Sequence, residues 1–298
     1  MREEKEMTTK QHYIPRFFLE RFTDKDGVLW VYDAENGKKY EKRADNICYI
    51  KNLYETEWDD SGKNEEKYVL QNDIENTFCK YESEFSKTLK EIDKIIRNDL
   101  NSGALICSNR NKEILCRFIA NLIFRNPKTM KEYKLSEIED EILNADETKS
   151  LCYVLDQIEF GSGLSIIKAA KKKAYLTEEI DGGVISDCVK DMRELPFMFL
   201  YAEEGSFIIK DMPVCAGTDK SILENNKLCF YVPLSSKIAV LYGNYTEIRR
   251  NRMVKINRDR VNNLNNVYIG SKEKQVKRVL CSSREQRDII AEMLKPEV

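Results

Sequence analysis

LQNDIENTFCKYESEFSKTLKEIDKII, residues 70–96, carries the clearest periodic signal in this chain of 298 residues. Apolar side chains recur there at steps of three or four, which places them on one face of a helix. They are Leu70, Ile74, Phe78, Tyr81, Phe85, Leu89, Ile92 and Ile96. The pattern predicts one long helix over about 65–97 with a buried apolar stripe.

A shorter helix is predicted next, over about 109–125. Ile114 and Leu122 lie on its buried face, and Pro127 follows the residue that ends it. Arg125 comes three residues after Leu122, so its side chain falls on the apolar face. A buried guanidinium needs partners. Arg125 is therefore either a structural bridge from the helix end to a glutamate or a clamp for an anionic ligand.

Further helical patterns follow this pair. Residues 134–147 form an acidic helical pattern whose role as lid, interface or plain surface is left open. Segments 150–160 and 163–175 also have helical spacing. Together these segments predict a helical block over about 65–192.

Strand signals flank the helical block. The run GVLWVYD at 27–33 is followed by Asn36-Gly37, a pair typical of β-hairpin turns. Short apolar runs between turn residues, from about 196 to 281, predict antiparallel strands. Ser282 followed by Glu285 has the spacing of a capping box and predicts a final helix.

The order of these elements predicts an α+β protein. It has a short N-terminal helix over 15–22 and a β-hairpin, a central helical block, and C-terminal antiparallel strands with a final helix. Phe18 and Phe22 are four residues apart and form a pair on the short helix. We expect residues 1–10 to be a charged tail and residues 11–298 to form a single domain.

The composition is that of a soluble globular protein, with 42% hydrophobic and 34% charged residues and a net charge of −2. No apolar run approaches the roughly 20 residues needed to cross a bilayer, so we expect no membrane partner. The charged opening is unlike a secretory signal. Nine cysteines, an odd number, lie mostly in apolar runs without a C-x-x-C pair. These observations predict a cytoplasmic protein with reduced cysteines. The sequence does not indicate its oligomeric state.

Basic residues are concentrated near the C-terminus. Residues 249–280 contain ten basic side chains against two acidic ones, which indicates a surface for nucleic acid or another polyanion. The alternative is an ordinary solvated surface. The candidate nucleic-acid contacts are Arg249, Arg250, Arg252, Lys255, Arg258 and Arg260.

Candidate catalytic residues are few, because the chain has a single histidine and no Gly-rich phosphate loop, H-E-x-x-H or G-x-S-x-G motif. His12 lies just before the short helix, where the positive end of the helix dipole favours the neutral imidazole of a general base. The alternative is a structural histidine bound to a backbone group.

Acidic candidates complete the set. Asp211 ends a strand before Met-Pro, a position found both in active sites and in simple turns. Glu75 and Glu82 lie seven residues apart on one flank of the apolar stripe. They are either a solvated edge or, together with Asp211, oxygen ligands for Mg²⁺.

The segment QHYIPRFFLERF, residues 11–22, resembles the opening signature of an uncharacterised, mainly bacterial family catalogued as a domain of unknown function. That signature reads Gln-His-Tyr-(Val/Ile)-Pro-x-(Phe/Tyr)-x-Leu-x-x-Phe. Its positions are filled here by Gln11, His12, Tyr13, Ile14, Pro15, Phe17, Leu19 and Phe22.

The resemblance covers about residues 9–281. It continues through VLWVYD, NLYE with Tyr54, Glu75 and Glu82, IANLIFRNP with Arg125, FIIKDMPV with Asp211, VPLSSKIAV, and NNLNNVYIGS with Leu264 and Asn265. Lys210 departs from the family pattern, which has a serine before the aspartate, so no role for that hydroxyl carries over. The resemblance implies that His12, Arg125 and Asp211 belong to one recurring pattern, and it implies no activity.

Two functions therefore remain open. The first is a phosphodiester-cleaving nuclease or nuclease-like effector, a kind of protein often found in bacterial defence or toxin systems. His12 would be the general acid or base, Arg125 would neutralise phosphate charge, and Asp211 with Glu75 or Glu82 would orient His12 or hold Mg²⁺. The second is a non-catalytic binding or regulatory module in which these residues form a structural polar network.

Overall fold

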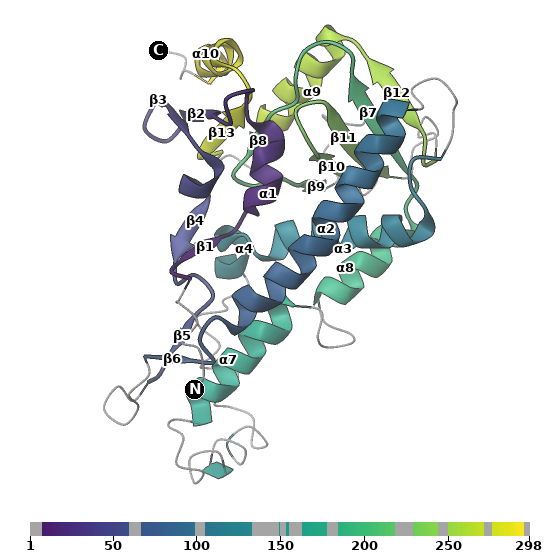
Figure 1. The fold of residues 1–298 in the computed structure, drawn as a ribbon. Coiled ribbons are helices and arrows are strands. Elements are labelled where there is room, and N and C mark those ends of the chain that lie inside the picture. The colour runs from purple at the N-terminus through teal and green to yellow at the C-terminus, as the bar shows by residue number, and fades with distance from the viewer. Residues whose placement is uncertain are drawn as a thin grey trace. The chain divides into compact units, whose positions relative to one another are not determined.

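The computed structural model confirms an α+β protein (Figure 1). It describes residues 8–59, 67–98, 105–132, 149, 153–154, 163–177, 184–217, 229–243, 250–270 and 276–294. The sequence predicts a single domain over 11–298. By its internal contacts the chain divides into two compact units, each formed by several segments. The first unit comprises Met1–Tyr13, Tyr49–Tyr81 and Phe124–Asp187, and the second comprises Ile14–Cys48, Glu82–Ile123 and Cys188–Val298.

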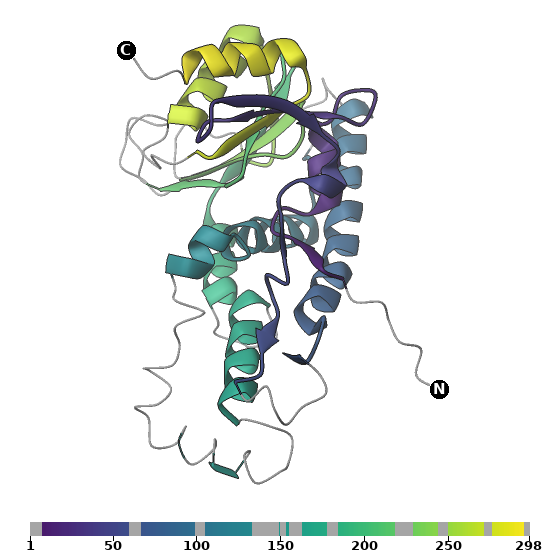
Figure 2. The ribbon, with the colours of Figure 1, turned by 90° about the vertical axis from the view of Figure 1, so that its left-hand side faces the viewer.

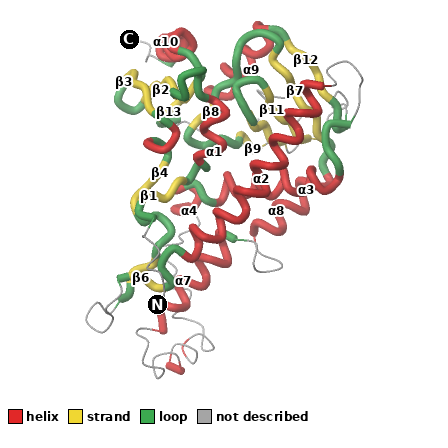
Figure 3. The backbone as a smooth tube through the Cα atoms, in the orientation of Figure 1, coloured by secondary structure: helices red, strands yellow, loops and turns green. Residues whose placement is uncertain are grey.

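The first unit combines short strands with helices. β1 (Lys10–His12) pairs antiparallel with β4 (Tyr49–Lys51), as Figure 3 shows, and β5 (Thr56–Glu57) pairs with β6 (Tyr68–Val69). Its helices are α4 (Pro127–Glu132), α7 (Gly163–Leu176) and the first part of α2 (Asp73–Asn98). Tyr54, Ile74, Phe78, Met130 and Leu176 form its apolar core.

The long helix α2 is confirmed, but its predicted start is wrong. It begins at Asp73, because residues 68–69 pair as strand β6 and the chain then turns. Leu70 and Asn72 adopt left-handed backbone conformations, with φ of 50° and 59°. Leu70 is 62% exposed and does not belong to the stripe, whereas Phe78 and Ile96 are buried as predicted.

The second unit contains two larger sheets. One has the order β12-β7-β11-β10-β9 and the other has the order β3-β2-β13-β8. The strands of the first are β7 (Phe197–Ala202), β9 (Cys215–Gly217), β10 (Cys229–Pro233), β11 (Ile238–Gly243) and β12 (Met253–Ile256). Those of the second are β2 (Leu29–Asp33), β3 (Lys38–Lys42), β8 (Ile209–Lys210) and β13 (Arg278–Cys281).

Strand pairing follows the prediction in one sheet and departs from it in the other. The β2–β3 hairpin is confirmed, with Gly37 at φ 63° in its turn. β12, however, runs parallel to β7, so the C-terminal strands are not all antiparallel. A parallel partner needs a long connection, and nothing in the local sequence of β12 identifies its neighbour.

Helices cover these sheets. They are α1 (Arg16–Leu19), the 3₁₀ turns η1 (Glu20–Phe22) and η2 (Ala44–Asn46), α3 (Asn109–Phe124), α8 (Val184–Glu194), α9 (Arg258–Gly270) and α10 (Arg284–Met293). Figure 2 shows α10 running along the sheet that contains β2, β3 and β13. The hydroxyl of Ser283 accepts the N–H of Gln286, so the helix cap is Ser283 and not Ser282 as predicted.

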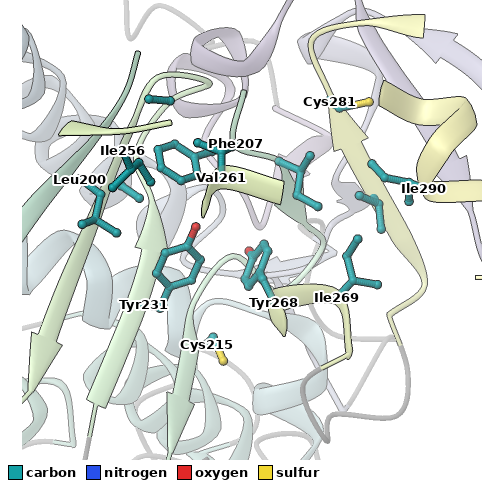
Figure 4. Close-up of a cluster of buried hydrophobic side chains, with 14 of the residues drawn as sticks. Leu200, Phe207, Cys215, Tyr231, Ile256, Val261, Tyr268, Ile269, Cys281 and Ile290 are labelled. Atoms are coloured by element: carbon teal, nitrogen blue, oxygen red, sulfur yellow. The ribbon is translucent and has the colours of Figure 1, made fainter. Parts of the chain in front are cut away.

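The core of the second unit lies between its sheets, α9 and α10. Figure 4 shows Tyr231 from β10 and Tyr268 from α9 near one another at its centre, with ring centroids 5.4 Å apart. Cys281 and Ile290 extend the same cluster to β13 and α10. This packing fixes the position of α9, whose tyrosine reaches the strand-end segment described below.

The short helix of the opening signature packs on α2 and α3. The rings of Phe18 and Phe22 are 5.5 Å apart, which confirms the predicted pair. Phe18 also contacts Phe118 at 4.9 Å, and Phe118 contacts Phe85 at 5.1 Å. No helix in the described part of the chain is long and apolar enough to span a bilayer.

Candidate functional site

A buried polar network in the first unit centres on Arg125, in the turn between α3 and α4. Its side chain is 1% exposed, as its place on the apolar face predicts. The guanidinium donates through Nε to the Tyr54 hydroxyl at 3.2 Å and through Nη2 to the backbone carbonyl of His12. The Tyr54 hydroxyl donates to the same carbonyl at 3.0 Å. His12 and Arg125 are thus brought together through the backbone of His12.

Aromatic rings hold the guanidinium from another side. Its central carbon lies 4.3 Å from the centroid of the Phe78 ring and 5.8 Å from that of Tyr54. A planar, weakly hydrated guanidinium is well suited to such stacking. Arg125 therefore contacts the backbone carbonyl of His12, the side chain of Tyr54 and, in the apolar stripe of α2, the ring of Phe78.

Gln11 attaches the N-terminal strand to the same region. Its fully buried side chain donates to the carboxylate of Glu55 at 2.5 Å and accepts the backbone N–H of Tyr54 at 2.7 Å. Lys172 of α7 donates to the Glu55 carbonyl at 2.8 Å. Burial lowers the pKa of Lys172 to about 8, although the negative charge of Glu55 opposes this shift. The Gln11 side chain is thus hydrogen-bonded to the backbone of Tyr54 and to the side chain of Glu55.

The His12 side chain is half-buried at the end of β1, and its ring centroid lies 5.6 Å from that of Tyr49. Tyr49 is its strand partner, so the contact follows from the β1–β4 register. His12 belongs to the first unit, whereas the short helix of the signature belongs to the second.

Asp211 lies in the second unit, directly after β8. Its backbone N–H donates to the carbonyl of Arg278 at 3.2 Å. Burial raises the pKa of the Asp211 carboxyl, while the charges of Arg278 and Lys210 oppose this shift. At the predicted strand end, the structure therefore has a largely buried carboxyl close to two cations, Arg278 and Lys210.

Lys210, the position that departs from the family pattern, is itself 1% exposed. Its ammonium lies 4.4 Å from the centroid of the Tyr268 ring. The Tyr268 hydroxyl donates to the Pro213 carbonyl at 2.7 Å and accepts the backbone N–H of Lys210 at 3.3 Å. Tyr268 therefore fixes the Asp-Met-Pro turn around Asp211 from α9.

The two glutamates proposed as Mg²⁺ ligands lie on different parts of α2. Glu75 belongs to the first unit, and Glu82 belongs to the second, as does Asp211. Among the described residues, no group of three or more His, Cys, Asp or Glu side chains is arranged to hold a metal ion. The structure thus assigns no metal ligand set to these acids.

The basic stripe of residues 249–260 is only partly described, because Arg249 lies outside the described residues. Lys255 pairs with Glu203 at 3.6 Å, and Arg258 pairs with Glu204 at 3.7 Å. Arg250, Arg252 and Arg260 make no ion pair with another described residue. Local carboxylates therefore compensate part of the positive charge that the sequence shows.

Three functional contacts were missed in the sequence. The sequence placed Tyr54 in a motif and Phe78 in the apolar stripe. In the structure, the Tyr54 hydroxyl accepts from Arg125 and the Phe78 ring stacks on its guanidinium. Arg21 in the opening signature was not singled out, yet its guanidinium binds Asp93 of α2 through two contacts of 2.8 Å. Arg21 follows Phe17 by four residues, and nothing in that local sequence indicates a partner 72 residues away.

Fold and site together define an α+β protein of two compact units whose N-terminal signature contributes one backbone acceptor, the carbonyl of His12, to a buried arginine network. The chain belongs to the family described as "Protein of unknown function (DUF4238)", which matches residues 10–277. This match confirms the predicted family resemblance. A search of the curated proteins and a search of the solved structures each find no match.

Proposed function

We propose that the protein is a non-catalytic binding or regulatory module in which the signature residues hold the first unit together. The observation that supports this function is the environment of Arg125. Its guanidinium is almost fully buried and donates to the backbone carbonyl of His12, so a phosphate in solvent has no direct access to it.

The contacts around His12 agree with this role. The network uses the carbonyl of His12, which every amino acid possesses, while the imidazole packs beside Tyr49. The thiols also fit an intracellular, reducing setting, because seven cysteines of the described part of the chain, Cys107 and Cys116 among them, are free. We propose a cytoplasmic location on this basis.

The test compares the wild-type chain with His12→Ala and Arg125→Met. We expect His12→Ala to keep its fold and its ligand binding, because the carbonyl remains. We expect Arg125→Met to unfold at lower temperature. Both proteins and the wild type are incubated with labelled RNA and DNA, with and without Mg²⁺. Hydrolysis by the wild type that disappears in a folded His12→Ala variant would reject the non-catalytic role.

One observation favours phosphodiester cleavage as a second candidate function. Burial raises the pKa of Asp211, and a carboxyl that keeps its proton to higher pH suits general acid catalysis. In this proposal a water molecule attacks the phosphorus, the bond to the leaving oxygen breaks, and Asp211 gives its proton to that oxygen, while Arg278 lies close enough to affect the charge of Asp211. Loss of hydrolysis in Asp211→Asn, with binding retained, is the result that supports cleavage.

A further inference from the structure

A row of positively charged side chains follows the second-unit part of α2. Lys87, Lys90, Lys94 and Arg97 are all exposed, and we name them the α2 ridge. At 3.6 residues per turn, their positions fall within an arc of about 80° and span about 15 Å along the helix. None of the four makes an ion pair with another described residue. The exposed carboxylate of Glu91 lies on the same face, four residues after Lys87, so these five side chains together present a net charge of +3 to solvent.

The ridge borders a shallow groove that is lined by Lys90, Asp93, Lys94, Arg97 and Asn98. The groove contains one carboxylate, that of Asp93, and this group is already neutralised by Arg21. Both terminal nitrogens of Arg21 bind Asp93 at 2.8 Å, and its Nε donates to the Leu234 carbonyl at 2.5 Å. The remaining charge in the groove is that of three cations.

Local effects within α2 account for only part of this arrangement. Arg97 and Lys94 lie in or near the last turn, where the helix dipole favours positive charge. Lys87 and Lys90 lie beyond the reach of that effect. Lys90–Lys94 and Lys94–Arg97 are like-charge pairs that cost roughly 0.2 to 0.5 kcal/mol each, while Lys87 has opposite charges at such spacings in Glu84 and Glu91. An anionic ligand would turn this repulsion into attraction.

We propose that the α2 ridge binds the phosphate backbone of a nucleic acid without reading its bases. This inference rests on the proposed binding function and names its ligand class. Lysine ammonium groups act as point charges toward phosphates, and their repeat along the helix suits a polyanion with regularly spaced charges. A net charge of only −2 on the whole chain allows a local basic surface to attract such a ligand.

A membrane surface fits the ridge less well. Helices that bind lipid headgroups insert an apolar face beside their basic face. The apolar face of this part of α2 is covered by protein, since Phe85, Leu89, Ile92 and Ile96 are each at most 2% exposed. The ridge therefore offers charge without an insertable apolar surface.

The test uses a variant in which Lys87, Lys90, Lys94 and Arg97 are all replaced by glutamine, which removes the charge and has a similar helix propensity. The control replaces four exposed lysines outside α2, Lys25, Lys38, Lys42 and Lys51, by glutamine, so the net charge changes equally. Binding to labelled duplex DNA and to single-stranded RNA is followed by fluorescence anisotropy at several salt concentrations. A third set of measurements uses vesicles of anionic phospholipid.

We expect the wild type and the control to bind nucleic acid with a steep salt dependence. For duplex DNA, the ridge variant should lose roughly 3 to 4 from the slope of log K against log salt, with affinity reduced by roughly a hundredfold at low salt. Unchanged binding in the ridge variant, equal loss in the control, or binding to vesicles alone would each overturn the proposal. Hydrolysis of the same DNA would reject the non-catalytic function and leave the ridge result unaffected.

Discussion

Arg125 and the α2 ridge show two opposite ways of placing positive charge in one chain. Arg125 is 1% exposed and donates to oxygens of Tyr54 and His12 while it stacks on Phe78. The ridge cations are exposed and make no ion pair with a described residue. Charge inside the first unit is satisfied by the fold, whereas charge on the second-unit part of α2 is available to a ligand.

The difference teaches where to look for function in this protein. The residues that a sequence pattern makes conspicuous, His12 and Arg125, meet through a backbone carbonyl and stabilise local structure. The residues that we propose to bind the ligand are ordinary lysines on the outer face of a helix. Predictions that separate the two regions therefore compare stability with binding.

Replacement of Arg125 by methionine should produce the largest effect on stability. It removes the two bonds that Arg125 donates to the His12 carbonyl and the Tyr54 hydroxyl, and leaves only the bond from Tyr54 to that carbonyl, which costs roughly 2 to 5 kcal/mol in the free energy of unfolding. Urea denaturation measures this change. The matched control is Arg16→Met in the same signature, because the Arg16 side chain is 64% exposed and, among the described residues, pairs with Glu20 four residues away. The control should change stability by less than about 1 kcal/mol.

Tyr54→Phe should have the next largest effect. It removes the hydroxyl that accepts from Arg125 and donates to the His12 carbonyl, and keeps the ring beside Phe78. We expect a loss of roughly 1 to 3 kcal/mol in the free energy of unfolding. Tyr49→Phe, on the neighbouring strand, serves as control. If both variants were equally stable, the polar network would not hold the first unit together.

Asp211→Asn should change the pH dependence of stability by a smaller amount. A raised pKa means that the folded state binds the Asp211 proton more tightly than the unfolded state does. This contribution is complete below the ordinary pKa of 3.8 and is lost as pH rises through the raised value. The stability of Asp211→Asn relative to wild type should therefore improve with rising pH. A relative stability that falls with pH would contradict a raised pKa.

The C-terminal stripe should contribute least to nucleic-acid binding. Glutamates pair with Lys255 and Arg258, and such exposed pairs reduce the charge offered to a ligand. We expect Lys255→Gln and Arg258→Gln together to lower affinity by less than about threefold, because each of these cations already has a carboxylate partner. An effect as large as that of the ridge variant would move the binding surface to the stripe.

Most features that depend on local spacing were predicted correctly, although α2 begins later than predicted and the last helix is capped one residue further on. The apolar period located α2 and placed Arg125 on a buried face, and Asn36-Gly37 located the β2–β3 turn. The features that depend on distant partners were not. The parallel pairing of β12 with β7 and the bond from Arg125 to a backbone carbonyl leave no trace in residue type.

The α2 ridge depends both on local spacing, which the sequence shows, and on distant partners, which it does not. The helical period that revealed the apolar stripe also places Lys87, Lys90, Lys94 and Arg97 on one arc, so this signal was present in the sequence. The basic segment at 249–280 is denser in charge and is therefore the stronger signal in the sequence. What the sequence could not show is that acids accompany the C-terminal stripe and that Arg21 neutralises Asp93 beside the ridge.

The most direct test of binding without cleavage uses a single sample of wild-type protein and labelled duplex DNA with Mg²⁺. Anisotropy is recorded across a salt titration, and the DNA is then recovered and sized on a denaturing gel. We predict salt-dependent binding with DNA of unchanged length, and loss of that binding in the ridge variant. DNA that is shortened by the wild type and left intact by a folded His12→Ala variant would contradict this function.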